Sequence, residues 1–548
     1  MWYLRARLHV VPLVIMMLCR PAVAQVGSAR LEGVVRDPSG AVVPGAVVSV
    51  LNTRTQIQAE TSATIKGIFI FPSLQPGFYM LSVEAAGFRK IVVSDLELNA
   101  GGTVVQNVKL EIGDIKESIV VHAGAERAQT ADAQIAQAVT LRDIEGLPQL
   151  GRAPLSLGIY SPGVQTKPGA PFISSSVNGT RQGSSNTRLD GIDVNDSLTP
   201  YFGFATTGFN TDSIEEFRIV TSGGKAEYGR NAGGQIELIT RSGTNTWHGG
   251  AFEYLRNTAL NANNFFNNSS LTPIARPKFI QNRFGVSVGG PIFRDRTFVF
   301  GNFQGLRTAQ QLVRNRTVLT AEAKSGLFRW KTPGTGALQT FDILAADPRK
   351  KGIDPEVAKI LAELPDPNNF DIGDGLDTAG YRFNNLATEN QQDSYDDQFT
   401  LRADHSVWHD HRLFFRWTRR TNRNVDNVGP TDARYPGLPY GHANAWGWGF
   451  SFGSDWAISA RLVNELRVGY KYYHLDLDRQ ARLQGPMLLA DPNLFADPLD
   501  PTFSQQRKPP VRHITDNLTF VRSKHTIKVG AEGRFTNEWR WWDDGIWA

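Results

Sequence analysis

The segment Ala445–Gly453 carries a large aromatic residue at every second position. Successive side chains of a strand point to opposite faces, so one face would hold only rings and the other only glycine and serine. These two faces are Trp446, Trp448, Phe450 and Phe452 against Gly447, Gly449, Ser451 and Gly453. A strand of a transmembrane β-barrel shows this division, with bulk toward lipid and small or polar groups toward the lumen. The alternative is a soluble all-β protein, whose sheets rarely expose such a row.

The same alternation recurs from Trp247 onward in about ten segments, each close to the ~10 residues that a tilted strand needs to cross a bilayer. In the segment that follows the aromatic one, Val468 is expected on the lipid face, with Arg467 and Lys471 toward the lumen. Short polar turns join some segments and long loops join others. This asymmetry is typical of short periplasmic turns and long external loops.

Residues 1–24 have the composition of a secretory signal peptide. Arg5 and Arg7 precede an apolar run from Val10 to Cys19, and Ala22-Val23-Ala24 forms a cleavage site before Gln25. Cys19 is the only cysteine, so the mature chain is expected to lack disulfides, thiol nucleophiles and cysteine-based zinc sites.

The charge of the chain does not point to nucleic acid as a partner. The formal net charge is +5, but the signal segment carries three arginines and no acid, which leaves 55 basic against 53 acidic side chains. No later stretch reaches 18 consecutive apolar residues, so a membrane crossing has to use strands. Export and alternating aromatic strands together predict the cell outer membrane.

Residues 25–112 are rich in valine and turn residues and predict a small β-sandwich of about seven strands. The runs GVVRDPSGAVVPGAVV, KGIFIFPSLQPGFY and EAAGF resemble the carboxypeptidase regulatory-like domain, a transthyretin-type sandwich that also falls within the carbohydrate-binding-like folds. The resemblance implies a fold and an accessory role, and no peptidase activity.

Residues 113–128 are expected to be a linker that contains a short β-prone run. Such a run in a polar setting suits strand addition to the sheet edge of a partner. It is similar to a TonB box, the segment by which outer-membrane transporters engage the energising protein in the periplasm. The alternative is that it forms the last strand of the sandwich. Its residues are Glu117, Ser118, Ile119, Val120, Val121, His122 and Ala123.

Residues 129–243 have a mixed α/β character, with helical turns expected at Leu141–Gly146 and at Ser213–Phe217. The runs LDGIDVND, IEEFRIVTSGGKAEYGR and GGQIELITRSGTN resemble, in family order, the plug domain of TonB-dependent outer-membrane receptors. The residues that carry the plug motif are Asp190, Gly191, Asp193, Asn195, Asp196, Tyr228, Gly229 and Arg230.

Residues 244–548 are expected to form a partial transmembrane antiparallel β-barrel. RFGVSVGGPIFRDRTFVFGNF resembles early barrel strands of the Oar-like subgroup, whose members also carry an N-terminal sandwich. Family barrels close with about 22 strands, so a chain with about ten is expected to be C-terminally truncated. Within a long insertion between Thr320 and Asp396, Asp354-Pro355 predicts the start of a helix.

No constellation in the sequence indicates catalysis, a cofactor or a metal. Ser222-Gly223-Gly224-Lys225 has serine and lysine at the spacing of some hydrolases, but its two glycines oppose the helix that this chemistry requires. The acidic run around Asp190 has the composition of a calcium site without a known loop spacing, and a turn with satisfied polar groups is favoured. The chain is therefore not expected to be an enzyme.

These features together predict TonB-dependent transport of a ligand, such as a carbohydrate or a peptide, through a plugged outer-membrane β-barrel. The alternative is an outer-membrane adhesin or ligand-binding scaffold that does not transport. The resemblance implies three partners: a TonB-type energising protein in the periplasm, outer-membrane lipid and an unknown extracellular ligand.

Overall fold

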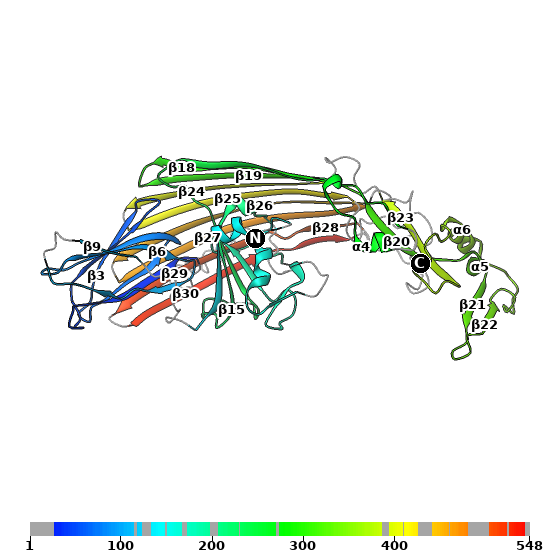
Figure 1. Ribbon diagram of the computed structural model, residues 1–548, viewed down its shortest axis with the longest axis horizontal. Helices are drawn as coiled ribbons and strands as arrows, with labels where there is room; N and C mark the ends of the chain where they lie inside the picture. The colour runs from blue at the N-terminus through cyan, green and yellow to red at the C-terminus, as the bar shows by residue number, and fades with distance from the viewer. Residues whose placement is uncertain are drawn as a thin grey trace, which may run out of the picture.

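The computed structural model consists mainly of β-strands, arranged as a curved wall, a smaller sheet enclosed by it, and a two-sheet unit at one end (Figure 1). None of the helices in the described part of the chain is long and apolar enough to cross a membrane. The structure describes residues 27–113, 118–122, 133–147, 149, 151–166, 172–197, 207–229, 231–269, 273–385, 394–408, 410–425, 441–459, 461–479, 504–522 and 525–542.

The wall is one antiparallel sheet of eleven strands, in which sequence neighbours pair from β17 to β27 apart from a long excursion between β19 and β24. Strand β27 pairs with both β28 and β29, β29 pairs with β30, and β28 pairs with β31. The strands are β17 (His248–Arg256), β18 (Phe279–Phe293), β19 (Thr297–Gln310), β24 (Tyr395–Trp408), β25 (His411–Val425), β26 (Gly441–Ser459), β27 (Leu462–Arg479), β28 (Gln505–Lys508), β29 (Val511–Arg522), β30 (His525–Thr536) and β31 (Trp539–Trp542).

The two faces of the wall differ in the way the alternation predicts. Along β26, Gly447, Gly449 and Ser451 are buried on the concave side, whereas the aromatic side chains lie on the convex side. Trp446 and Trp456 lie at the two ends of the convex face, ten positions apart, which is about 33 Å along a strand. With the usual tilt this becomes a height of about 25 Å, the thickness of the apolar band between aromatic girdles.

The two ends of the wall differ in the length of their connections (Figure 1). At one end, short turns join β18 to β19, β24 to β25, β26 to β27 and β29 to β30. Connections of sixteen residues or more join β17 to β18 and β19 to β24 at the other end. By the rule for outer-membrane barrels, the first end faces the periplasm and the second faces outward.

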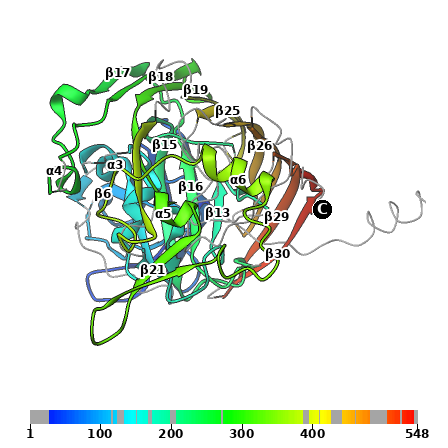
Figure 2. The same ribbon diagram turned by 90° about the vertical axis from the view of Figure 1, so that its right-hand side faces the viewer.

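A five-stranded sheet lies inside the curve of the wall, as the view along the strands shows (Figure 2). Its order is β10-β15-β16-β13-β14, and its buried apolar side chains include Phe217, Ile236 and Leu238. It occupies the place expected for a plug. Its elements are β10 (Ile135–Thr140), α3 (Leu141–Gly146), η1 (Pro154–Tyr160), β11 (Val164–Gln165), η2 (Phe172–Ser174), β12 (Ser176–Val177), β13 (Asn186–Leu189), β14 (Ile192–Asp193), η3 (Thr211–Ser213), β15 (Ile214–Ser222) and β16 (Gln235–Thr240).

The N-terminal unit is a sandwich of two sheets at the short-turn end of the wall (Figure 1). One sheet has the order β4-β1-β7, with β8 also paired to β1, and the other has the order β3-β2-β5-β6-β9. Leu31, Val50, Leu81 and Leu98 are among the side chains that fill the space between them. The strands are β1 (Ala29–Arg36), β2 (Val47–Asn52), β3 (Gln58–Ser62), β4 (Ile68–Leu74), β5 (Gly77–Glu84), β6 (Lys90–Leu98), β7 (Thr103–Val105), β8 (Val108–Lys109) and β9 (Ser118–His122).

The long excursion between β19 and β24 folds into a small unit with its own apolar cluster around Val318, Leu319 and Leu364. Its helix α6 begins at Pro355, and the Asp354 side chain accepts from the Glu356 amide as the predicted N-cap. Its elements are β20 (Leu312–Leu319), α5 (Ala321–Lys324), β21 (Leu327–Lys331), β22 (Leu338–Asp342), α6 (Pro355–Glu363) and β23 (Thr378–Asn385); the β17–β18 loop adds η4 (Thr258–Leu260) and α4 (Phe265–Ser269).

Two local expectations differ from the structure. Residues 214–217 form the start of strand β15 and not a helix, because Ile214 and Phe217 both pack into the apolar cluster of the plug sheet. The stretch 113–128, expected to be a linker, contains β9, which pairs in parallel with β6 as the alternative of a last sandwich strand predicted. Ile119 packs against the sandwich core, and this burial explains why the segment joins the sheet.

Candidate functional site at the interface between plug and wall

A tight hairpin presents the plug motif to the concave face of the wall. Asp190 and Gly191 connect β13 to β14, and Leu189 pairs directly with Ile192 across the turn. Both connecting residues have positive φ, 49° for Asp190 and 82° for Gly191. A two-residue turn of this kind favours Asp-Gly, because glycine adopts positive φ without strain and aspartate tolerates it. The first role of Asp190 and Gly191 is therefore to form the tight turn of the hairpin.

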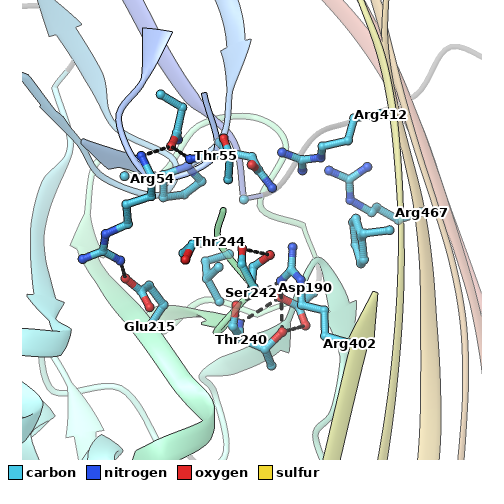
Figure 3. A pocket seen from close by; sticks show the side chains of 18 residues that line it. Arg54, Thr55, Asp190, Glu215, Thr240, Ser242, Thr244, Arg402, Arg412 and Arg467 are labelled. Atoms are coloured by element: carbon cyan, nitrogen blue, oxygen red, sulfur yellow. Dashed lines mark hydrogen bonds and ion pairs between the residues drawn. The ribbon is translucent and has the colours of Figure 1, made fainter. Parts of the chain in front are cut away.

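The carboxylate of Asp190 bridges two arginines of the wall (Figure 3 shows the arginine from β24). It lies 3.0 Å from Arg402 Nη1 and 2.9 Å from Arg416 Nε. It also accepts from the backbone amide of Thr240 at 3.0 Å and from the Thr240 hydroxyl at 2.9 Å. All three charged side chains are at most 5% exposed. Removal of one partner from such a buried pair costs about 3–5 kcal/mol, so this contact fixes the hairpin to the wall.

The network continues toward the short-turn end. Arg402 also pairs with Asp404 at 2.8 Å, and the Ser242 hydroxyl of the plug donates to Asp404 at 2.8 Å. The guanidinium groups of Arg402 and Arg467 each lie 5.0 Å from the ring centroid of Phe414, within the range of cation–π contacts. Phe414 interrupts the alternation of its strand, and its inward ring is accommodated beside Gly453.

A second set of contacts fixes the plug to β29 and β30. The Asp193 carboxylate lies 3.3 Å from Arg534 Nε, and its backbone amide donates to His513 Nδ1 at 3.1 Å. His513 Nε2 contacts Glu532 at 2.9 Å, and Arg188 of the plug pairs with the same Glu532 at 2.8 Å. Ion pairs thus join the plug to the wall at two separate places along the curve of the wall.

Asn195 organises the chain just after the hairpin. Its side-chain oxygen accepts from the Thr187 amide at 2.8 Å, and its side-chain nitrogen donates to the Ser185 carbonyl at 3.0 Å. Its backbone carbonyl accepts from the Lys471 ammonium of the wall. Lys471 and Arg467 both lie on the concave face, buried, as the alternation predicted.

The other motif residues occupy less central positions. Asp196 is buried beside the hairpin, and Gly229 lies on the surface with open space at its Cα. The backbone amide of Tyr228 donates to Lys225 at 3.0 Å, and burial raises the pKa of the Tyr228 phenol. Arg230, Glu117 and Ala123 lie outside the described residues.

Two buried glutamates of the plug escaped the sequence analysis. Burial raises the pKa of Glu216 to about 8 and that of Glu237 also to about 8. Neither carboxylate oxygen of Glu237 accepts a hydrogen bond from a described residue. Arg188 and Arg218 stand opposite Glu237 in the register of the two neighbouring strands. The one signal in the sequence is that each glutamate stands in a run that forms a strand, with Glu237 between Ile236 and Leu238 and Glu216 next to Phe217.

The acidic run does not form a cation cage. Asp190 and Asp193 are both engaged by wall arginines, and arginine competes with any metal for the same oxygens. Within the described ranges, no group of three His, Cys, Asp or Glu side chains is arranged to hold a metal ion.

Sandwich, plug and wall meet around a cavity of about 90 Å³ (Figure 3). Arg54 and Thr55 come from the sandwich, Glu215 from the plug, and Arg412 and Arg467 from the wall. Arg54 pairs with Glu215 at 2.5 Å across this junction. The sandwich therefore lies against the plug at the short-turn end of the wall.

Comparison with known proteins agrees with this architecture. Residues 239–544 match the family model "Outer membrane beta barrel domain", and residues 30–111 match "Carboxypeptidase regulatory-like domain". The TonB-dependent transporter Oar of Myxococcus xanthus is 26% identical over 333 residues, which are 59% of this chain and 30% of that protein. The chain thus spans less than a third of the length of this relative.

Two of the solved structures that overlap with part of this fold are a transporter and a siderophore receptor. The transporter YddB of Escherichia coli overlaps with a TM-score of 0.45 at 11% identity, covering 74% of this chain and 48% of that one. The siderophore receptor PirA of Acinetobacter baumannii overlaps with a TM-score of 0.35 at 14% identity, covering 74% and 57%.

The fold and its matches define a mainly β outer-membrane protein with a plug inside its wall and a sandwich beneath it. The chain belongs to the outer membrane beta barrel family, whose model matches more than half of it. It is also similar, over part of its length, to the TonB-dependent transporter Oar. The family match agrees with the outer-membrane location predicted from the sequence.

Proposed function

We propose that the chain takes part in TonB-dependent transport of a ligand, such as a carbohydrate or a peptide, through a plugged β-barrel of the outer membrane. The observation that carries this proposal is the attachment of the plug to the wall through Asp190, Arg402 and Arg416. Such a lock keeps the lumen closed at rest, and opening it requires work because charged groups would be separated in a dry interface.

The work is supplied by a TonB-type protein in the periplasm that engages strand β9. In its sheet β9 is an edge strand, paired on one side with β6. A free strand edge accepts an added strand through backbone hydrogen bonds. This supports a coupling segment at residues 117–123. The same proposal has the chain secreted after removal of residues 1–24.

Three units follow from the same proposal. The sandwich at 25–112, extended by β9, lies at the periplasmic mouth. The plug comprises residues 129–243 and carries the motif from Asp190 to Asp196, and the wall comprises 244–548. The extracellular ligand meets the long-loop end, and its class is open between carbohydrate and peptide.

A cysteine placed inside the lock tests this function without knowledge of the ligand. Thr240 is 2% exposed and lies between plug and wall, and the mature chain is expected to have no other thiol. In the cells that make the protein, Thr240→Cys is expected to react with a maleimide when the membrane is energised. The reaction should stop after addition of a protonophore or deletion of the TonB-type protein.

The matched control is Leu260→Cys on an outer loop, where the side chain is 78% exposed and should react in every condition. A non-transporting adhesin predicts that Thr240→Cys stays unreactive whether or not the membrane is energised. That result would contradict the proposed transport and favour the scaffold.

A further inference from the structure

The turn that follows β6 is held by two ionisable side chains of the plug. Ala100 lies two residues beyond the end of β6 and is fully buried. Its backbone amide donates to the Glu216 carboxylate at 3.0 and 3.2 Å, and its carbonyl accepts from Arg218 Nη1 at 3.1 Å. Both the N–H and the C=O of one residue are thus held by neighbouring positions on one face of β15.

Further contacts surround this peptide unit. Arg218 Nη2 also donates to Gln134 at 3.1 Å, which fixes its guanidinium in the junction. Gly101 has φ +63°, and a Cβ there would lie 3.1 Å from Arg218 Nη1, so the close approach requires glycine. We call Glu216 and Arg218, with the Ala100 backbone between them, the Ala100 clamp.

The clamp lies at the end of the strand that pairs with β9. Strands β6 and β9 run parallel over five matched pairs, from Lys90 with Ser118 to Ser94 with His122. The Ser94 hydroxyl also contacts His122 Nδ1 at 2.8 Å. A pull along β9 therefore loads all five pairs together as shear, and β6 passes the load to the turn at Ala100.

We infer that the Ala100 clamp transmits a pull on β9 to plug strand β15, so that sandwich and plug move as one body. This inference rests on the proposed function, because it assigns a route to the force of the periplasmic partner. Glu216 and Arg218 are then positioning residues for coupling. Strand β15 pairs with β16, whose last residue Thr240 contacts Asp190, so the route ends at the lock in the wall.

A second route exists in the covalent connection from β9 to β10. Residues 123–132 can reach about 35 Å when fully extended. If that connection carried the load, the clamp would be dispensable. When β9 is pulled, the clamp would resist at short extension, whereas the covalent connection would resist only after it has been stretched.

Single-molecule pulling separates these routes and needs neither ligand nor periplasmic partner. The full chain, with Cys19→Ser and Val121→Cys, is inserted in a supported lipid bilayer and pulled through the new thiol. With the clamp intact, we expect the first force peak at short extension. With Glu216→Ala, the early peak should disappear and resistance should begin up to about 35 Å later.

Two variants keep this test specific. Glu216→Gln still accepts from the Ala100 amide and should restore the early peak. Glu60→Gln removes an exposed carboxylate from β3 without touching Ala100 and should leave the trace unchanged. Circular dichroism verifies that each variant keeps its strands. If Glu216→Ala unfolds the plug, the comparison rests on Arg218→Lys, because a single ammonium cannot donate to both Ala100 and Gln134 as the guanidinium does.

Identical extensions for the unaltered chain and the clamp variants would overturn the relay and assign the load to the covalent connection. This outcome is independent of the maleimide test in cells. If pulling shows the early force peak but Thr240→Cys is not labelled in energised cells, the clamp transmits force but no partner pulls on it. If Thr240→Cys is labelled but the early peak is absent, the force reaches the plug by another route.

Discussion

The convex and concave faces of β26 and β27 belong to the same strands, yet they meet different surroundings. On the convex face, Trp448 and Tyr470 are tilted rings with centroids 5.2 Å apart. On the concave face, Gly469 lies against Ile192 of the plug, and Lys471 reaches the backbone of Asn195. The comparison teaches that one alternating pattern places apolar side chains toward lipid on one side and small or charged side chains toward a protein interface on the other.

The largest effect is expected at the lock itself. Asp190→Asn keeps a residue that tolerates positive φ but removes the charge that Arg402 and Arg416 share. Two buried guanidinium groups then lose a partner, and the free energy of unfolding of the plug should fall by about 3–5 kcal/mol. Urea titration monitored by protease cleavage of the plug measures this loss. Unchanged stability would show that the interface is hydrated and the lock is not buried.

An arginine on the convex face should have the next largest effect. Val468→Arg places a charge in lipid and should lower barrel stability by about 2–4 kcal/mol near the mid-plane. Arg467→Ala on the opposite face removes an ion pair with Asp455 at 2.6 Å, but it should cost less because Asp455 still pairs with Arg412 at 2.9 Å. Refolding into lipid vesicles, followed by electrophoretic mobility, gives both values. The reverse ranking would indicate that the two faces were exchanged.

The sequence predicted these faces well because alternation depends only on the period of a strand. It favoured a turn in the acidic run around Asp190, since turn chemistry is local, but it did not place the two-residue hairpin at Asp190-Gly191. It missed the partners of Asp190, which lie more than two hundred positions away in β24 and β25. It also misassigned residues 214–217 as helical, because a buried Glu216 looks like a surface residue until its distant partner Ala100 is known.

Close packing of the concave face predicts a smaller effect from added methyl groups. A Cβ at Gly469 would lie 2.7 Å from side-chain carbons of Ile192, whereas a Cβ at Gly250 on β17 would meet nothing within 4 Å. Gly469→Ala should therefore destabilise the contact of plug and wall by about 1–3 kcal/mol, and Gly250→Ala should not. Thermal unfolding of the two variants makes this comparison. Equal values would mean that the plug does not touch β27.

The smallest effect concerns pH at the junction of sandwich and plug. Burial raises the pKa of Glu216 to about 8 in the folded chain, although Arg218 opposes the shift and Glu97 and Glu215 add to it. The folded state therefore binds this proton more tightly, so its stabilising effect is complete below about pH 4.5 and is lost as pH rises toward 8.

Glu216→Gln should flatten that part of the pH profile, measured as the thermal midpoint between pH 5 and 9. The slope that remains should come from other groups, among them Glu237, whose pKa is also raised to about 8. A variant with the same slope as the unaltered chain would show that Glu216 is ionised in the folded state.

The most direct test of the central claim, that one face of the wall meets lipid and the other holds the plug, is a spin-label scan along β26. Single cysteines from 446 to 453 would be labelled in lipid vesicles, and their collisions with molecular oxygen, which concentrates in the bilayer, would be measured. The account predicts high oxygen accessibility at 446, 448, 450 and 452 and low accessibility at 447, 449, 451 and 453. A flat profile, or one with the opposite phase, would contradict it.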